Sequence, residues 1–517
     1  MTDAAYDALV VGAGHNGLAC AAYLARSGRK VLVLEAAERP GGLAATREFA
    51  DGFRVSAAAH LLNMLSPEVA RDLALERHGL AYAARHLKTV VLPGDGRQLV
   101  IDGDRLEGAS ANDQAAFSEF QRQTQRFAKV LNRFCARPFP RLCERRGRDH
   151  RLLAKLAWDL RALGKADLRE LLRIGAINIH DLAQERFDNP LLKAALGMDA
   201  VLGSHMGPRS PNTVYAYLHR HLNDGGQGPA LVKGGMGALG DAFAAAAEAA
   251  GATIRYGARV AGIDLSDCRT VGVTLADGSA LAAPLVASNA DLASTFQLVG
   301  LLNLDAGFVR RVHNFRARGV TAKLHLALDG LPEFQDLSPA DAGSRLLAAA
   351  SMDGIEAAFN HAKYGECSPG PVMEISVPTV HDDSLAPPGK HVLSAVAQYA
   401  PYALKAGWQV GRETFMRACL ARLEALAPGI GERVIAAELL TPPDLEAQFG
   451  LRGGHWHHGE IALDQALFTR PVPGANHYAT PVPGLYLCGA SAHPGGGLLG
   501  LAGRNAAKAI LAGEAAA

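Results

Sequence analysis

Residues 6–35 read YDALVVGAGHNGLACAAYLARSGRKVLVLE. An apolar run at 6–11 leads directly into a turn with three glycines, and an Ala/Leu-rich stretch of helical character follows. A second apolar run, 30–34, ends at an acid, Glu35. Strand, glycine turn, helix, strand and acid in this order predict a Rossmann-type βαβ unit that binds a dinucleotide.

Each residue type in this unit has a physical role. Gly12 permits the tight turn out of the strand, Gly14 lets the backbone approach a pyrophosphate, and Gly17 lets the helix pack on the strands. The helix start offers free N–H groups and a partial positive charge to the phosphates. Glu35, eighteen residues after Gly17, can accept hydrogen bonds from both ribose hydroxyls. The alternative is a glycine-rich turn in any α/β protein.

Two other segments match the glycine spacing. Gly235–Gly240 follows a polar, glycine-rich loop, and no acid ends the next run. Gly495–Gly500 follows a plausible strand, but no second strand comes after it. We therefore expect one dinucleotide-binding domain and no separate NAD(P) domain.

Composition narrows the classes of protein that fit. Of the 517 residues, 49% are hydrophobic, which suits two domains with a large core. The formal net charge of +1 argues against nucleic acid as the main partner. The seven cysteines are scattered without a CxxC pair, as in a reducing compartment. Neither a signal peptide nor a run of eighteen apolar residues is visible, so we expect a cytoplasmic protein, soluble or peripheral to a membrane.

The region 112–221 has a helical pattern and is strongly basic. Residues 121–173 hold fifteen Lys and Arg against five Asp and Glu. Two interpretations stay open for this stretch: a solvated basic face of a helical subdomain, or a surface that sits on anionic lipid.

Four motifs together suggest a family. They are EAAERPGGLAAT at 35–46, DGF at 51–53, AAAH at 57–60 and GLYLCGASAHPGGGLLGLAGRNAA at 484–507. This set resembles the phytoene desaturase-like branch of the FAD-dependent amine oxidase superfamily. Within that branch it is most similar to the group called pyridine nucleotide-disulfide oxidoreductase domain-containing protein 2, although the disulfide motif of that name is absent here. The resemblance is strong at both ends of the chain and weaker in the middle.

The resemblance implies a fold and a cofactor. We expect an α/β protein with a Rossmann-type, glutathione reductase-like FAD-binding domain and a substrate domain of mixed sheet and helices. The FAD-binding domain would be discontinuous, formed by 1–75, 230–295 and 455–517. The substrate domain would take 76–229 and 296–454 and include the basic helical subdomain at 112–221.

The resemblance also assigns cofactor contacts beyond the first turn. Arg39 would neutralise the pyrophosphate, and the Val260 backbone would hold the adenine. The remaining contacts are backbone segments that pass close to the phosphate, ribityl and ring portions of FAD: Gly41, Gly42, Gly489, Ala490, Ser491, Gly496, Gly497 and Leu498.

Two residues are candidates for catalysis. Lys323 lies in a strand-like run at the place where amine oxidases of this superfamily hold a water against the flavin, and burial there would lower its pKa. The alternative is a surface lysine on a strand edge. His458, in the cluster His455-Trp456-His457-His458 with Glu460, would border the flavin and substrate. No second ligand pair stands near this cluster, so we expect no metal site.

Three functions remain open at this point. The first is an FAD-dependent oxidoreductase of desaturase or dehydrogenase type that acts on an apolar, isoprenoid or carotenoid-like small molecule, as the family implies. The second is an oxygen-using enzyme like the amine oxidases, although only three tryptophans are available for an aromatic cage. The third is a flavin-holding interaction protein with little turnover. The oligomeric state and the electron acceptor do not follow from the sequence.

Overall fold

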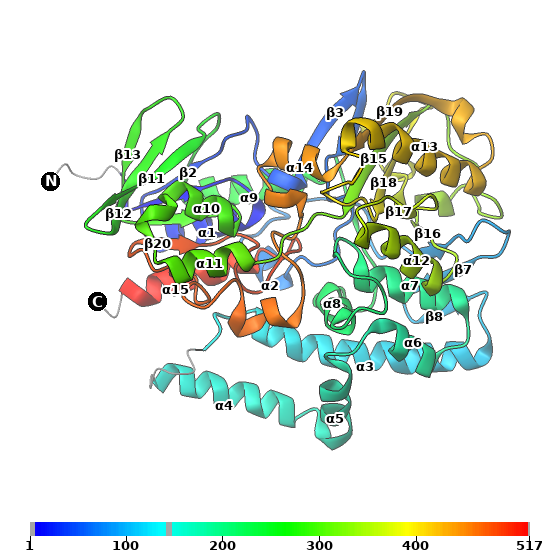
Figure 1. Cartoon of the computed structure of the whole chain (residues 1–517), viewed down its shortest axis with the longest axis horizontal. Coiled ribbons are helices and arrows are strands. Elements are labelled where there is room, and N and C mark those ends of the chain that lie inside the picture. Colours follow the sequence, from blue (N-terminus) through cyan, green and yellow to red (C-terminus); the bar gives the residue numbers. More distant parts are fainter. Residues whose placement is uncertain (1–5, 141–146, 515–517) are drawn as a thin grey trace.

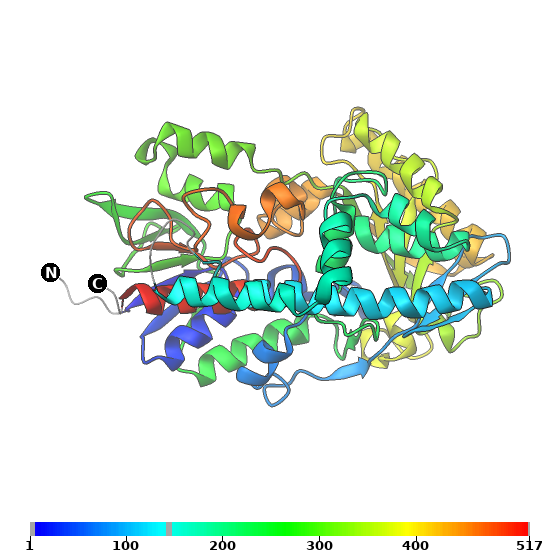
Figure 2. The same ribbon diagram turned by 90° about the horizontal axis from the view of Figure 1, so that it is seen from below.

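The computed structural model describes residues 6–140 and 147–514. Two sheets stand side by side along the long axis of the molecule, and the helices of the basic region run along one side (Figures 1 and 2). The described amino and carboxyl ends lie close together at the first sheet (Figure 1).

The first sheet is the predicted dinucleotide-binding sheet. Its five strands are all parallel, in the order β10 (Thr253–Arg255), β2 (Val31–Leu34), β1 (Ala8–Val11), β14 (Val286–Ser288) and β20 (Leu485–Leu487). This confirms the α/β class and the Rossmann-type unit. The strands come from the three segments assigned to this domain, whose boundaries stay a prediction.

Small side chains let the covering helices come close to this sheet. One hydrophobic core joins the strands to α1 (His15–Arg26), α9 (Gly237–Ala249) and α15 (Leu501–Glu514). The same core includes a three-stranded antiparallel sheet and three short helices: β11 (Val260–Ser266), β12 (Arg269–Leu275), β13 (Ala280–Ala282), α2 (Pro67–Asp72), α10 (Leu292–Val299) and α11 (Ala306–Asn314).

The second sheet has eight strands and mixed direction. The order is β19 (Val434–Leu440), β15 (Thr321–Leu328), β18 (His391–Gln398), β17 (Val372–Ser376), β16 (Arg345–Ala348), β6 (Thr89–Val91), β7 (Leu99–Asp102) and β8 (Arg105–Glu107). The pair β16 and β6 is parallel and the other neighbours are antiparallel. One face packs on α13 (Trp408–Leu426).

The other face of this sheet meets the helical region. The helices are α3 (Ala111–Cys135), α4 (Gly147–Arg161), α5 (Gly164–Ile174), α6 (Ile179–Arg186), α7 (Pro190–Val201), α8 (Thr213–Arg220) and α12 (Met352–Lys363). Of these, α3, α6, α7, α8 and α12 share a core with the sheet, and α5 adds only its last residue, Ile174, to that core. The helices α4 and α5 project as an arm (Figure 1). In the described ranges, no helix has the length and apolarity needed to cross a bilayer.

Short elements join the two sheets. They are the hairpin of β3 (Thr46–Ala50) and β4 (Phe53–Ser56), the pair β5 (Tyr82–Ala84) and β9 (Leu231–Val232), and α14 (Pro442–Phe449). In Figure 1, β3 and α14 stand between the sheets.

One prediction of a strand from the sequence is wrong. The run 252–263 reads as a single strand, but the chain turns at Gly257, whose φ is +62°. The first half therefore becomes β10 of the parallel sheet and the second half starts β11 of another sheet. Sequence reasoning also missed β16 and β19, because a short buried apolar run does not distinguish strand from helix.

The contact between α1 and α15 supports a stability prediction. A Cβ added at Gly503 of α15 would lie 1.9 Å from the carbonyl oxygen of Asn16 in α1. We expect Gly503→Ala to force the helices apart and lower the unfolding free energy by about 1–3 kcal/mol, seen as a lower Tm.

A helical glycine with free space serves as the control. A Cβ at Gly354 in α12 would have its nearest neighbour at 3.4 Å, which is an ordinary contact. Gly354→Ala should keep or raise the Tm. Equal Tm values for Gly503→Ala and the wild type would contradict the close approach of the two helices.

Candidate functional site

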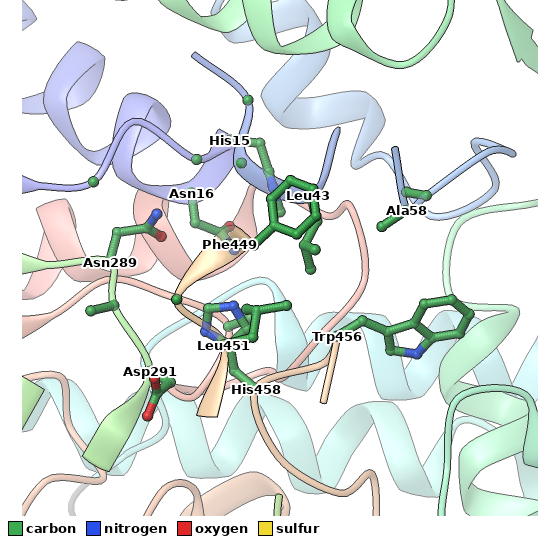
Figure 3. Close-up of a pocket in the computed structure, with 18 of the residues that line it drawn as sticks. His15, Asn16, Leu43, Ala58, Asn289, Asp291, Phe449, Leu451, Trp456 and His458 are labelled. Atoms are coloured by element: carbon green, nitrogen blue, oxygen red, sulfur yellow. The ribbon is translucent and has the colours of Figure 1, made fainter. Parts of the chain in front are cut away.

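A cavity of about 570 Å³ lies between the two sheets (Figure 3). At one end it is lined by the glycine turn after β1 and by Glu35 after β2, at the carboxyl edge where parallel sheets bind ligands. At the other end it is lined by Glu374 of β17 and Val396 of β18. A single space therefore connects the dinucleotide turn with the substrate domain.

The glycine turn is held by residues far away in the sequence. The Glu35 carboxylate accepts hydrogen bonds from the amides of Ala13, at 2.6 Å, and Ala37, at 2.9 Å. A Cβ at Gly14 would lie 2.7 Å from Asn289 Nδ2, and one at Gly17 would lie 2.2 Å from the carbonyl oxygen of Gly12. Glu35 thus braces the turn as well as facing the cavity where a ribose is expected.

Most of the predicted cofactor residues border this cavity. Gly12, Gly14, Glu35, Gly41, Gly42, Val260, Ala490, Gly497, Leu498 and the catalytic candidate His458 all line it. They come from the beginning, the middle and the end of the chain. The structure thus brings together three segments that are distant in sequence.

The other predicted residues lie behind the wall or outside it. Gly17 and Gly489 pack against Gly12 and Asn289, and Ser491 donates a hydrogen bond to the carbonyl oxygen of His458 at 3.1 Å. Gly496 packs against His457, since a Cβ there would lie 2.4 Å from that side chain. Arg39 is exposed and does not line the cavity.

Several polar atoms at the cavity are buried without a partner among the described residues. They include His15 Nε2, Asn16 Oδ1 and His458 Nδ1. The helix α1 begins at His15, and its N-cap residue, Gly14, has no side chain that could bind the first amides of the helix. Buried polar groups without partners are costly, and a phosphate-containing ligand at this helix start would satisfy such donors.

Two half-buried histidines, His15 of α1 and His458 of the loop before β20, face the same space (Figure 3). Burial, with a smaller effect from the charge of His458, lowers the pKa of His15 to about 4. Burial likewise lowers the pKa of His458 to about 4, although Asp291 opposes the shift. Both rings are therefore neutral near pH 7 and can serve as hydrogen-bonding groups rather than cations.

Lys323 is not the surface lysine of the alternative interpretation. It lies in β15 and is 2% exposed. It pairs with Val396 of β18, which in turn pairs with Glu374 of β17, so the three side chains share one face of the sheet. Nζ has no partner in the described chain, and Lys323 is not among the residues that line the cavity. Burial lowers the pKa of Lys323 to about 7, with Glu374 acting in the opposite direction.

Within the predicted histidine cluster, His455 contacts Glu460 rather than the cavity. His455 is buried, and its Nε2 lies 3.2 Å from Glu460 Oε1. Trp456, His457 and His458 line the cavity. In residues 6–140 and 147–514 there is no grouping of three His, Cys, Asp or Glu that could hold a metal ion.

Sequence reasoning missed residues that the fold brings to the cavity. Asn289 and Asp291 follow β14 at the carboxyl edge of the sheet, where a polar run after a buried strand was a usable signal. His60 lies in the AAAH motif, but no role was assigned to it. Arg220 and Glu374 carried no sequence signal, because they meet only through tertiary packing.

The buried Lys323 predicts a pH-dependent stability. Between the pKa of about 7 in the folded protein and the ordinary value of 10.5, the unfolded chain binds a proton that the folded chain does not. This group therefore makes stability rise with pH from about 7 to 10.5. We expect Lys323→Met to be more stable than the wild type at pH 7, with the difference shrinking towards pH 10. Unfolding free energies at both pH values test this, and a constant difference would contradict a buried, charge-losing lysine.

Comparisons with known proteins agree with this geometry. The family described as flavin containing amine oxidoreductase matches residues 17–517. The mouse pyridine nucleotide-disulfide oxidoreductase domain-containing protein 2 is 37% identical over 541 residues, covering 98% of this chain and 93% of its own. A lycopene-forming phytoene desaturase from Paracoccus sp. is 27% identical and covers 98% of this chain and 97% of its own.

A solved structure shares the fold. Wild-type putrescine oxidase, in a structure with bound putrescine, has a TM-score of 0.59 at 16% identity and covers 99% of this chain and 99% of its own. The family match agrees with the predicted family and with FAD as the cofactor. The chain is a member of the flavin containing amine oxidoreductase family and uses FAD.

Proposed function

We propose that this oxidoreductase removes hydrogen from an apolar small molecule, as a desaturase or dehydrogenase does. The observation that carries the proposal is the single cavity that continues from the dinucleotide turn to the second sheet. Between the two ends its walls are largely apolar, formed by Leu43, Ala58, Leu61, Met64, Leu202, Leu451 and Trp456. Ligand sites of this kind bury most of an apolar molecule.

The chain's own residues suit FAD along the first part of this cavity. Glu35 would receive the ribose hydroxyls, and the first amides of α1 would receive the pyrophosphate. Gly42 and Leu498 border the space beyond, towards the apolar walls. When bound, FAD supplies a two-electron oxidation by accepting a hydride.

The protein's own contribution to the reaction comes from the apolar walls and the neutral histidines of the cavity. The walls exclude water and hold an apolar molecule in place. His15 and His458 offer neutral hydrogen-bonding atoms without adding charge. Lys323 has a pKa near 7 behind the wall and can hold or release a proton at neutral pH. As part of this proposal, Lys323 and His458 take part in catalysis.

The charges near the cavity make a protonated amine a poorer candidate. Arg220 lines the polar end, and Lys323, when protonated, adds a second cation on the same face of the sheet as Glu374. The carboxylate of Glu374 is already shared by Arg345 and Arg220. An ammonium group would therefore meet no free anion at this end.

Anaerobic titration of the yellow holoprotein tests the proposal. We expect an isoprenoid such as farnesol or β-farnesene to bleach the flavin absorbance, and putrescine or benzylamine to leave it unchanged. Bleaching by an amine, with peroxide released in air, would instead support the amine oxidase alternative. No bleaching by any isoprenoid, acyl lipid or amine would favour a flavin-holding protein with little turnover. Mass spectrometry of apolar molecules that co-purify with the protein selects further substrates.

Glu35 predicts how firmly FAD is retained. Removing the carboxylate by Glu35→Ala frees the Ala13 amide and removes the ribose acceptor, so we expect FAD affinity to fall by roughly ten- to a hundredfold. Glu38→Ala, which removes an exposed acid three residues later, is the control. The FAD-to-protein ratio after dialysis measures the loss. Full retention in Glu35→Ala would show that this carboxylate does not hold the cofactor.

We also propose that the arm formed by α4 and α5 contacts anionic lipid. Trp158 is 70% exposed and Leu172 is 74% exposed, and the same two helices carry exposed basic side chains such as Arg151, Lys155 and Lys165. Large apolar side chains in a basic helical surface suit a membrane interface. Part of the predicted basic stretch 121–173, residues 141–146, lies outside the described residues.

Vesicle sedimentation tests this contact. The wild type should sediment with vesicles that contain phosphatidylglycerol more than with pure phosphatidylcholine vesicles. The double variant Trp158→Ser with Leu172→Ser should lose most of that binding. Tyr364→Ser, which removes another large side chain that is 76% exposed, should not. Equal sedimentation of the wild type and the double variant would rule the arm out as the contact.

A further inference from the structure

A second hollow lies beside the cavity, and the proposed function assigns no role to it. It has a volume of about 800 Å³ and lies among α10, the end of α12, α14 and the loops that follow α11 and β18. Ser294, Gln297 and Gly450 line both spaces. The second hollow therefore adjoins the cavity along α10 and along the loop after α14.

The loop after α14 changes in character where it passes from one space to the other. Phe449 and Leu451 line the cavity (Figure 3), and Gly450 between them lines both spaces. Gly450 caps α14 with a φ of +66°, so the chain turns at this point. Arg452 lines the second hollow and not the cavity. An apolar wall is thus followed by a cation over residues 449–452.

The charges on the wall of the second hollow are mostly positive. Its lining holds three cations and one acid: Arg318, Lys363, Arg452 and Glu446. Lys363 is already paired, since its Nζ lies 3.2 Å from Glu356 Oε1. The two arginines therefore decide the charge that the hollow presents to a ligand.

Neither arginine has a counter-ion in the part of the chain that the structure describes. No hydrogen bond or ion pair joins the guanidinium group of Arg318 or Arg452 to residues 6–140 and 147–514. Arg316, two residues before Arg318, instead pairs with Asp464 at 2.6 Å. Arg318 and Arg452 also line a third hollow of about 350 Å³ together, so the two are neighbours. Two adjacent cations without a counter-ion repel each other until an anion binds between them.

The charges of both arginines reach other residues that line the second hollow. Burial lowers the pKa of His205, and the charge of Arg318 adds a smaller effect in the same direction, although Glu460 opposes it. A hydrogen bond to a carboxylate raises the pKa of Tyr402, and the charge of Arg452 opposes that shift. Both guanidinium groups therefore lie close to the wall of the hollow.

Few chemical groups match this wall. An ammonium group would be repelled by the two arginines. A phosphate or carboxylate accepts paired hydrogen bonds from a guanidinium group and balances its charge. The walls of the adjoining cavity are largely apolar. A molecule that suits both spaces therefore carries an anionic head group on an apolar chain.

We propose that Arg318 and Arg452 bind the anionic head group, a phosphate or a carboxylate, of a molecule whose apolar chain extends past Gly450 into the cavity. This inference rests on the proposed function and narrows its substrate class to acidic molecules with an apolar chain. Phe449 and Leu451 contact that chain where it enters the cavity.

Three ligands with one apolar chain test the proposal on the holoprotein. Isothermal titration calorimetry at low salt gives the Kd of farnesyl phosphate, of farnesoic acid and of farnesol, which has no charge. We expect at least one of the two acids to bind about tenfold more tightly than farnesol, the gain that charge-assisted hydrogen bonds give. This ratio should shrink at high salt, because salt screens exposed charges. If neither acid binds more tightly than farnesol, the proposal is overturned.

A double variant assigns the effect to the two arginines. Arg318→Gln with Arg452→Gln should bring the ratio of the farnesol Kd to the Kd of the tighter acid close to one and leave the farnesol Kd unchanged. Arg310→Gln with Arg417→Gln removes the same charge from exposed side chains outside the hollow, so the ratio should stay near ten. A ratio that stays near ten in the first double variant would overturn the proposal.

Inorganic phosphate separates a site for a free anion from a site for a substrate. It lacks the apolar chain, so we expect it to bind far more weakly than farnesyl phosphate. Inorganic phosphate that binds as tightly as farnesyl phosphate would contradict the proposal. If farnesol binds and an anionic head group adds nothing, only the inference about the head group fails. If none of the three farnesyl ligands binds, the proposed apolar substrate fails as well.

Discussion

The structure depends on the turn between β1 and α1, which three distant parts of the chain hold in place. Glu35 accepts a hydrogen bond from the amide of Ala13. The amide of Gly41 donates to the carbonyl oxygen of Ala13 at 2.9 Å. A Cβ at Gly14 would lie 2.7 Å from Asn289 Nδ2, and one at Gly17 would lie 2.2 Å from the carbonyl oxygen of Gly12 and 3.1 Å from Asn289 Cβ. A dinucleotide site therefore exists only when the neighbouring strands β2, β1 and β14 are assembled around this turn.

The second constraint is that two sheets share one cavity. The face of the eight-stranded sheet that contributes Glu374 and Val396 to the cavity also carries Lys323 and Ser394, so polar residues stand where a purely structural core would carry aliphatic ones. The opposite face is aliphatic and packs on α13. This difference between faces follows from the two-residue period of a strand. It places ionisable groups beside the cavity while the sheet remains stable on its other side.

The first sixty residues were enough to predict the Rossmann-type unit, because turn, helix and acid follow one another in the chain. The resemblance at both ends likewise pointed to FAD. The polar end of the cavity could not be predicted in this way. Glu374, Arg220 and Arg345 lie on three different elements and meet only in the folded protein. His60 stood in a motif, but no local pattern reveals that its Nε2 lies 3.1 Å from Glu374 Oε1.

The burial of Lys323 could not be predicted from the local sequence either. Its strand was expected, yet sequence alone left a surface position and a buried one equally open. The fully buried pattern of β15 decides the matter, because neighbours on both edges and packing on both faces remove it from solvent. The wrong strand at 252–263 has a similar origin, since one glycine with positive φ assigns its two halves to different sheets.

We expect segments from the beginning, middle and end of the chain to hold one FAD molecule jointly. The most direct measurement is the ratio of FAD to protein in purified, folded material, from absorbance and the mass of the released cofactor. We expect a yellow protein with about one FAD per chain that reloads after the cofactor is removed. Folded protein that is colourless and takes up no flavin when FAD is supplied would contradict this expectation.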